Sequence, residues 1–220
     1  LTGEILADLT LPNLLDVVYC MNGRVDVGRD VGGAGTAAGG ESAELRINPG
    51  VRLFGAAAGD VLIVNRGSRL IARGNVNQPI IFTARQDIEG TITNPDTASR
   101  LWAGVVIAGR APINTCNAAV TAGSVDCQQP IEGILASTGR NSLYGGASPN
   151  DNSGELECVQ IRFPGAFLPG AAAGDDLNGL TLGGVGSGTL INRVQIHNSG
   201  DDGVEVFGGA VNLRNFVVTG

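Results

Sequence analysis

The sequence contains no lysine and one histidine, and aromatic residues make up only 4% of it. All of its basic side chains are therefore arginines, and the formal net charge is -7. A nucleic-acid partner is not expected, because binding phosphates requires a basic surface. No apolar run reaches the length of a membrane-spanning helix, so no membrane span is expected. The single histidine also excludes a metal site built on paired histidines.

The four cysteines form neither a Cys-x-x-Cys pair nor a zinc-binding spacing. Cys116 and Cys127 flank a polar, turn-rich segment, which predicts a disulfide across that loop and an oxidising compartment. Cys20 and Cys158 either pair with each other or stay single in the core. The chain starts at Leu1 rather than methionine, so we expect a processed or partial product whose secretion signal has been removed. An extracellular or cell-surface location follows from these expectations.

Glycine is abundant, with 35 residues, and it punctuates short apolar segments. Residues 45–53 and 62–70 share one pattern seventeen residues apart, in which alternating apolar residues lead into Gly50 or Gly67 and resume beyond it. Alternation predicts strands, and the interval is too short for a helix between them. Near the C-terminus similar segments recur at offsets in the low to middle twenties, which fits one turn of a three-sided parallel β-helix. The predicted fold class is an all-β parallel β-helix solenoid.

The chain divides into residues 1–24, expected to be an N-terminal capping or subunit-contacting segment, and residues 25–220, the β-helix. Loops at about 84–100 and 108–153 are rich in polar and turn-forming residues, and we expect them to project from the body. Residues 101–107 are too apolar for an edge strand, so they predict a strand buried on both faces. Trp102 within this run is expected to pack in the core.

Several motifs resemble one family of proteins. They are Arg-Gly-Ser at 66–68, Pro-Ile-Ile-Phe-Thr at 79–83, the apolar run and its continuation at 102–114, and Asp-Asp-Gly-Val-Glu-Val-Phe-Gly-Gly at 201–209. From about Val25 onward the chain resembles secreted bacterial right-handed parallel β-helix proteins of the pectin-lyase-like type, often labelled surface proteins or lipoproteins. The resemblance implies an exported solenoid with loops on one side. It transfers no catalytic residues.

Two acidic pairs, Asp175-Asp176 and Asp201-Asp202, are the candidate polar sites, and three interpretations stay open. Asp-Asp-Gly is typical of turns, in which aspartate satisfies local backbone donors. The same carboxylates suit calcium, the one cofactor that we consider. Adjacent aspartates also serve as acid and base in polygalacturonase-type enzymes that share the fold. The flanking Asn-Thr-Asp, Gly-His-Gly and Arg-Ile-Lys motifs of those enzymes are absent here.

Five arginines lie in the regular repeat region: Arg46, Arg52, Arg66, Arg69 and Arg73. The seventeen-residue register would stack Arg52 beside Arg69, and such a row suits an acidic polysaccharide. We favour the alternative, a solvent-facing ladder in which arginines alternate with acids.

The expected function is a non-catalytic extracellular structural or surface β-helix. The apolar N-terminal residues and the last strand, which still has the pattern of an interior strand, suggest that subunits pair head to tail into filaments. The expected contact residues are Leu9, Leu11, Leu14, Leu15, Phe216 and Val218. The alternatives are a polysaccharide-active lyase or glycoside hydrolase, and a glycan-binding adhesin module that uses the long loops.

Overall fold

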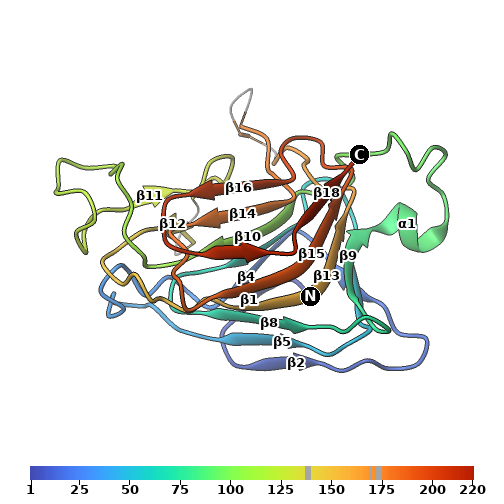
Figure 1. Cartoon of the computed structure of the whole chain (residues 1–220), viewed down its shortest axis with the longest axis horizontal. Helices are drawn as coiled ribbons and strands as arrows, with labels where there is room; N and C mark the ends of the chain where they lie inside the picture. Colours follow the sequence, from blue (N-terminus) through green and yellow to red (C-terminus); the bar gives the residue numbers. More distant parts are fainter. Residues whose placement is uncertain (137–139, 169, 172–174) are drawn as a thin grey trace.

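The computed structural model describes residues 1–136, 140–168, 170–171 and 175–220, and its strands wind into a three-sided parallel β-helix (Figure 1). The first side is a six-stranded parallel sheet, and each of its strands opens one coil, so the described strands make six coils. We call it sheet 1. Its strands, in order, are β1 (Gly3–Ile5), β4 (Arg24–Val27), β7 (Val61–Val64), β10 (Gly104–Ala108), β14 (Leu180–Gly183) and β16 (Val204–Phe207).

The other two sides share long strands. The second side holds β2 (Leu9–Leu11), β5 (Glu44–Ile47), β8 (Arg69–Arg73) and β17 (Asn212–Arg214). The third side holds β3 (Tyr19–Met21), β6 (Arg52–Gly55), β9 (Ile80–Ala84) and β18 (Val217–Thr219). Strands β13 (Gly154–Arg162) and β15 (Leu190–His197) belong to both sides. Each bends at one residue in the left-handed conformation, Cys158 or Arg193.

The core consists of apolar columns that run along the helix axis. One column on sheet 1 is Val25, Leu62, Val105, Leu180 and Val204, which pair in register from coil to coil. Its first four side chains are fully buried. Burying aliphatic side chains of this size contributes about 1.5–3 kcal/mol each, so these columns dominate the stability of the solenoid.

The predicted fold class is confirmed, and so are the C-terminal offsets. Leu180 pairs with Val204 and Ile191 with Leu213, at the spacings expected for one coil. The seventeen-residue interval, in contrast, is not a coil. Leu45 pairs with Leu70, one full turn later. Residues 45–53 span β5 and β6, the second and third sides of one coil, whereas residues 62–70 span β7 and the start of β8, the first and second sides of the next coil. The two segments look alike because all three sides have similar strand–turn patterns.

The observed register does not stack Arg52 beside Arg69, as the seventeen-residue interval had predicted. Arg52 pairs with Ile81, and Arg69 pairs with Glu44, so Arg52 and Arg69 do not stack. Glu44 instead forms ion pairs with Arg46 and with Arg69. This arrangement is the ladder of alternating arginines and acids that we favoured over an arginine row.

Residues 1–24 lie within the β-helix rather than outside it. Strands β1, β2 and β3 pair in parallel with β4, β5 and β6, and together they make the first coil. The strands of the β-helix therefore include this segment from Gly3 onward, because its apolar residues continue the inward columns of the later coils.

The two expected loops differ in structure. Residues 85–103 contain the helix α1 (Arg85–Glu89), which ends at Gly90 in the left-handed conformation. Residues 109–153 contain a short antiparallel pair, β11 (Gln129–Pro130) with β12 (Leu143–Tyr144). Within the part of the chain that the structure describes, no helix has the length and apolarity needed to cross a membrane.

Candidate functional site

In the described part of the insertion at 109–153, several apolar residues pack on the outer face of sheet 1, while most of residues 114–126 are exposed. The outward side chains Ile63 and Val106 are buried there against Ile113, Ile131 and Tyr144 of the insertion. The expectation of a projecting loop therefore does not hold for the part of the insertion around Ile131 and Tyr144. The physical reason is that β7 and β10 carry apolar residues on both faces, and the outer face needs a cover.

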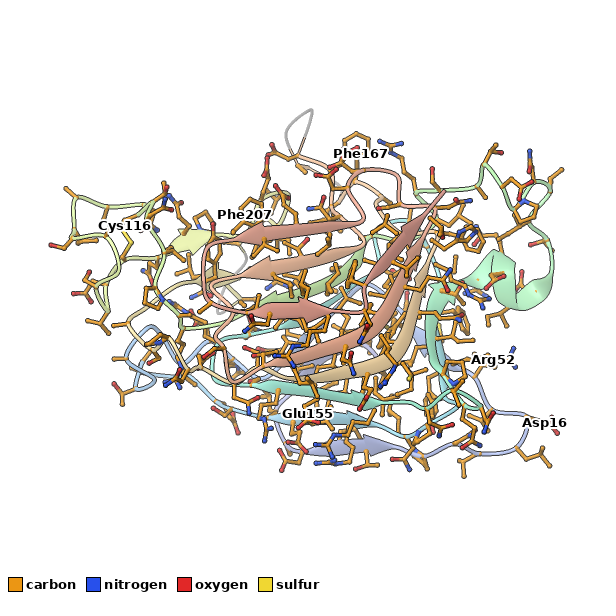
Figure 2. All side chains as sticks on the ribbon, viewed as in Figure 1. Asp16, Arg52, Cys116, Glu155, Phe167 and Phe207 are labelled. Atoms are coloured by element: carbon orange, nitrogen blue, oxygen red, sulfur yellow. A yellow bond between two sulfur atoms is a disulfide. The ribbon has the colours of Figure 1, made fainter. Side chains whose placement is uncertain are left out.

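The expected disulfide between Cys116 and Cys127 is present in this insertion. Cys127 is fully buried in the apolar cluster between sheet 1 and the insertion, and Cys116 packs against the same cluster. Figure 2 shows Cys116 on the same side of the molecule as Phe207 of β16, whose ring lies 5.9 Å from that of Tyr144. Cys20 and Cys158 are free thiols rather than partners. The disulfide thus fastens the cover of sheet 1.

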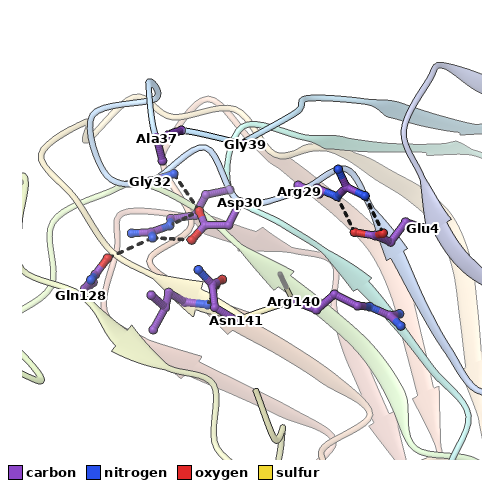
Figure 3. Close-up of a pocket in the computed structure, with 12 residues that line it drawn as sticks. Glu4, Arg29, Asp30, Gly32, Ala37, Gly39, Gln128, Arg140 and Asn141 are labelled. Atoms are coloured by element: carbon purple, nitrogen blue, oxygen red, sulfur yellow. Dashed lines mark hydrogen bonds and ion pairs between the residues drawn. The ribbon is translucent and has the colours of Figure 1, made fainter. Parts of the chain in front are cut away.

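A polar cavity of about 610 Å³ lies beside this cover, next to the first coils. Its walls come from β1, from the loop after β4, from the turn after β7, and from two parts of the insertion. Figure 3 shows the Arg29–Glu4 pair on one side and Asp30 with Gln128 on the other. The lining residues are Glu4, Arg29, Asp30, Gly32, Ala37, Ala38, Gly39, Arg66, Gln128, Arg140, Asn141 and Leu143.

Arg66 anchors one wall of the cavity. It is 1% exposed, and its Nε and Nη2 groups donate to the carboxylate of Asp30 at 2.7 and 2.6 Å. Its guanidinium also donates to the Gly145 carbonyl at 2.9 Å and to Oε1 of Gln128 at 3.0 Å. One buried cation therefore joins three segments that are distant in sequence, and all its charge is matched by Asp30.

Arg29 and Glu4 form the opposite wall. Arg29 donates from Nε and Nη2 to the two carboxylate oxygens of Glu4, at 2.8 and 3.0 Å. These hydrogen bonds hold the pKa of Glu4 below its ordinary value, and the nearby charge of Arg140 lowers the pKa further. Glu4 is therefore ionised at neutral pH, and Arg140 lies within electrostatic reach of it.

Below the cavity, one carboxylate faces two arginines. Asp26 is fully buried and accepts two hydrogen bonds from Arg24, each 2.9 Å long. Arg140 pairs with the same carboxylate from the insertion, and the Asn65 amide donates to it at 3.0 Å. A single carboxylate balances only one guanidinium, so this group carries a net positive charge.

Apart from Arg66, which the sequence offered only as part of an arginine row, the cavity residues were not found from the sequence, because they lie far apart along the chain. One local signal was present. Arg24 and Asp26 are two residues apart on a strand and therefore share a face. That spacing indicates a pair, but it does not indicate that Arg140, more than a hundred residues later, joins it.

The expected calcium ligands do not gather in the structure. Asp176 pairs with Arg100 at 2.8 Å, while Asp201 and Asp202 are exposed at the turn before β16. In residues 1–136, 140–168, 170–171 and 175–220, no three of His, Cys, Asp and Glu form a group that suits a metal ion. The observed role of Asp202 is a backbone one, since its carbonyl accepts hydrogen bonds from Gly179 N–H and the Ser199 hydroxyl.

The expected contact residues fall into two groups. Leu11 is buried, and Leu9 and Phe216 pack against the solenoid core. Leu14, Leu15 and Val218 are exposed, at 51%, 91% and 52%. Leu9 and Leu11 therefore contribute first to the interior of their own coil, and exposed apolar surface remains at Leu14, Leu15 and Val218.

The winding, the apolar columns and the single-residue bends define a parallel β-helix domain. The family model described as "Pectate-lyase like beta helix domain" matches residues 34–220, so the chain belongs to this family. No curated protein and no solved structure matched the chain.

Proposed function

We propose that this protein is a non-catalytic extracellular β-helix with a structural role at the cell surface. The observation that carries the proposal is that the apolar outer face and most of the arginines already have partners within the same chain. The outer face of sheet 1 is packed under the insertion, and most arginines are paired with carboxylates of the same chain.

The arginines illustrate this engagement. Polysaccharide lyase chemistry of the calcium-dependent type uses a cationic base, usually arginine or lysine. Among the residues that the structure describes, every arginine except Arg52 and Arg214 forms an ion pair with a carboxylate. The histidine, His197, contacts the Thr219 hydroxyl at 3.0 Å and the edge of the Phe163 ring. Within the described residues, no three of His, Cys, Asp and Glu form a group that suits a metal ion, and Asp201 and Asp202 are no exception.

The test is an assay of the purified protein on a panel of neutral and acidic polysaccharides. Reducing ends report hydrolysis, and ultraviolet absorbance of unsaturated uronates reports elimination. We expect no turnover, with or without added calcium. Turnover that disappears in an Asp201→Ala/Asp202→Ala variant would replace this proposal with the enzyme alternative and would locate the site.

Head-to-tail assembly is a second part of the proposal. The inward residues of β16 and β18 are half-exposed, with Val206 at 45% and Val218 at 52%. A further parallel coil stacked on this edge would bury them and would pair the backbone. A second copy of the chain supplies that coil in our proposal.

Sedimentation velocity and negative-stain microscopy of the 220-residue chain test assembly. We expect oligomers that lengthen with concentration and that are lost in Val218→Glu. The matched control is Val76→Glu, which introduces the same charge at an 86% exposed position in the turn between β8 and β9. Monomers at high concentration, or equal effects of the two substitutions, would remove assembly from the proposal and leave the surface role.

A further inference from the structure

We propose that the cavity beside the first coils binds a compact oxyanion group, a carboxylate or a phosphate. This goes beyond the proposed structural role, which requires no ligand. The inference rests on the charge balance of the cavity, on its unused hydrogen-bond donors and on its rigid walls.

The charge balance is positive. Among the residues that line the cavity, Arg29, Arg66 and Arg140 face two carboxylates, those of Glu4 and Asp30. Outside the lining, Arg24 pairs with Asp26, and Glu41 lies within electrostatic reach of Arg29. Asp30 and Arg66 balance each other and leave the sum unchanged. This positive lining lies in a chain whose net charge is -7, so it runs against the overall field. A bound anion would give the partly buried guanidinium groups of the lining a further counterion.

The unused donors surround the same space. Arg29 and Arg140 each keep an Nη1 group, and Gln128 and Asn141 each keep a side-chain amide NH₂. None of these four groups donates a hydrogen bond to another described residue. All four residues line the cavity, and Figure 3 shows Asn141 below Asp30 and the Arg140 side chain below the Arg29–Glu4 pair. Guanidinium and amide N–H groups are the donors that carboxylates and phosphates accept from.

The cavity does not suit a cation. Its two lining carboxylates, Glu4 and Asp30, are each held by two hydrogen bonds from one arginine. No group of three acidic, histidine or cysteine side chains is found in the part of the chain that the structure describes. A metal ion would therefore have to break an ion pair in order to bind, whereas an oxyanion meets free donors.

The walls are rigid enough to select a ligand. Arg66 is buried and joins the loop after β4, the turn after β7 and the insertion. Preorganised donors bind with a smaller loss of conformational entropy. The disulfide between Cys116 and Cys127 further restrains the insertion that contributes Gln128.

The experiment is isothermal titration calorimetry of the full chain with inorganic phosphate and with acetate, at ionic strength held constant with chloride. We expect saturable binding of one molecule per chain for at least one of the two anions, and their relative affinities distinguish a phosphate group from a carboxylate. Absence of saturable binding to both anions would overturn the proposal. So would an equal response to chloride, since this would show screening rather than a site.

Variants then locate the binding. Arg140→Gln leaves Asp26 paired with Arg24 and Asn65, so the fold is expected to survive, and affinity should fall about tenfold or more. Arg140→Lys keeps the charge and should retain more affinity than Arg140→Gln. The matched control is Arg214→Gln, which removes the same charge from an exposed position on β17. Equal affinity in the parent and Arg140→Gln, or equal losses in Arg140→Gln and Arg214→Gln, would refute this location. Unchanged Trp102 fluorescence in Arg140→Gln checks that the solenoid core is intact.

Discussion

Leu62 and Ile63 are neighbours in β7 whose side chains enter two different cores. Leu62 points inward between Val25 and Val105 of the adjacent coils, and Ile63 points outward under the insertion. Both are fully buried. Truncating each residue to alanine therefore separates the stability of the solenoid from that of its cover.

The expected magnitudes follow from burial. Removing a fully buried leucine or isoleucine side chain to alanine costs about 2–5 kcal/mol, and more when the surroundings cannot relax. Leu62 is held between two paired coils, so we expect Leu62→Ala to lower the global free energy of unfolding by an amount in the upper half of that range. Ile63→Ala should mainly lower the local stability of residues 109–153, because its lost contacts lie on the insertion. Reducing the Cys116–Cys127 disulfide, which closes a loop of 11 residues, should lower the same local stability by about 3 kcal/mol.

Two probes separate the cores. Trp102 is fully buried in the solenoid core, so its fluorescence during urea unfolding reports the coils. Hydrogen exchange of the amides in 109–153 reports the cover. We expect Leu62→Ala to shift the Trp102 midpoint strongly, and Ile63→Ala to accelerate exchange in the insertion more than it shifts that midpoint. If Ile63→Ala and Leu62→Ala change both probes equally, the insertion is not a separate cover and the reasoning fails.

Three further predictions test the turns and the edge of the fold. Burial raises the pKa of Glu205 in the folded protein above the ordinary value of 4.5. The folded state therefore favours the protonated carboxyl, and the parent loses stability as pH rises from 4.5 through the folded-state pKa. Glu205→Gln cannot ionise, so in urea titrations it should gain stability over the parent across that pH range. No gain with rising pH would contradict this. Gly154→Ala should prevent folding or cost several kcal/mol, because a Cβ there would lie 2.1 Å from the Leu70 carbonyl oxygen. In the control Gly90→Ala the added Cβ meets open space, so this variant should cost about 1 kcal/mol of stability in thermal melting. Equal costs would refute the contact. Cys158→Asn should be neutral or stabilising, because asparagine tolerates the left-handed conformation at this bend, and a loss of more than about 1 kcal/mol would show another role for the thiol.

The parts of the fold that the sequence predicts are those set by local patterns. The run at 101–107 has no polar side, and β10 is buried along its whole length. The offsets near the C-terminus match the observed pairing because the last two coils lack long insertions between their strands. The disulfide was predictable because a polar loop of suitable length separates its two cysteines.

The parts that the sequence does not predict depend on where long insertions fold. The seventeen-residue pattern compares sides rather than coils, because a strand with a glycine turn looks alike on every side of the solenoid. Likewise, nothing local to Arg140 shows that it reaches Asp26, since that contact exists only once the insertion lies on sheet 1. Pairs of such separation follow from three-dimensional stacking, which alternation along one strand does not encode.

The position of the insertion nevertheless follows from a physical argument that starts with one strand. A parallel strand with apolar residues on both faces needs two covers, and the solenoid interior supplies only one. Ile63 and Val106 therefore require a second layer from elsewhere in the chain, and the longest insertion, which leaves from the end of β10, is the nearest segment that can provide it. Once it lies there, Arg140 meets Asp26 and Gln128 meets Arg66, so the polar cavity forms at the edge of the cover. The charge excess of that cavity is thus a consequence of the same apolar surface that closes sheet 1.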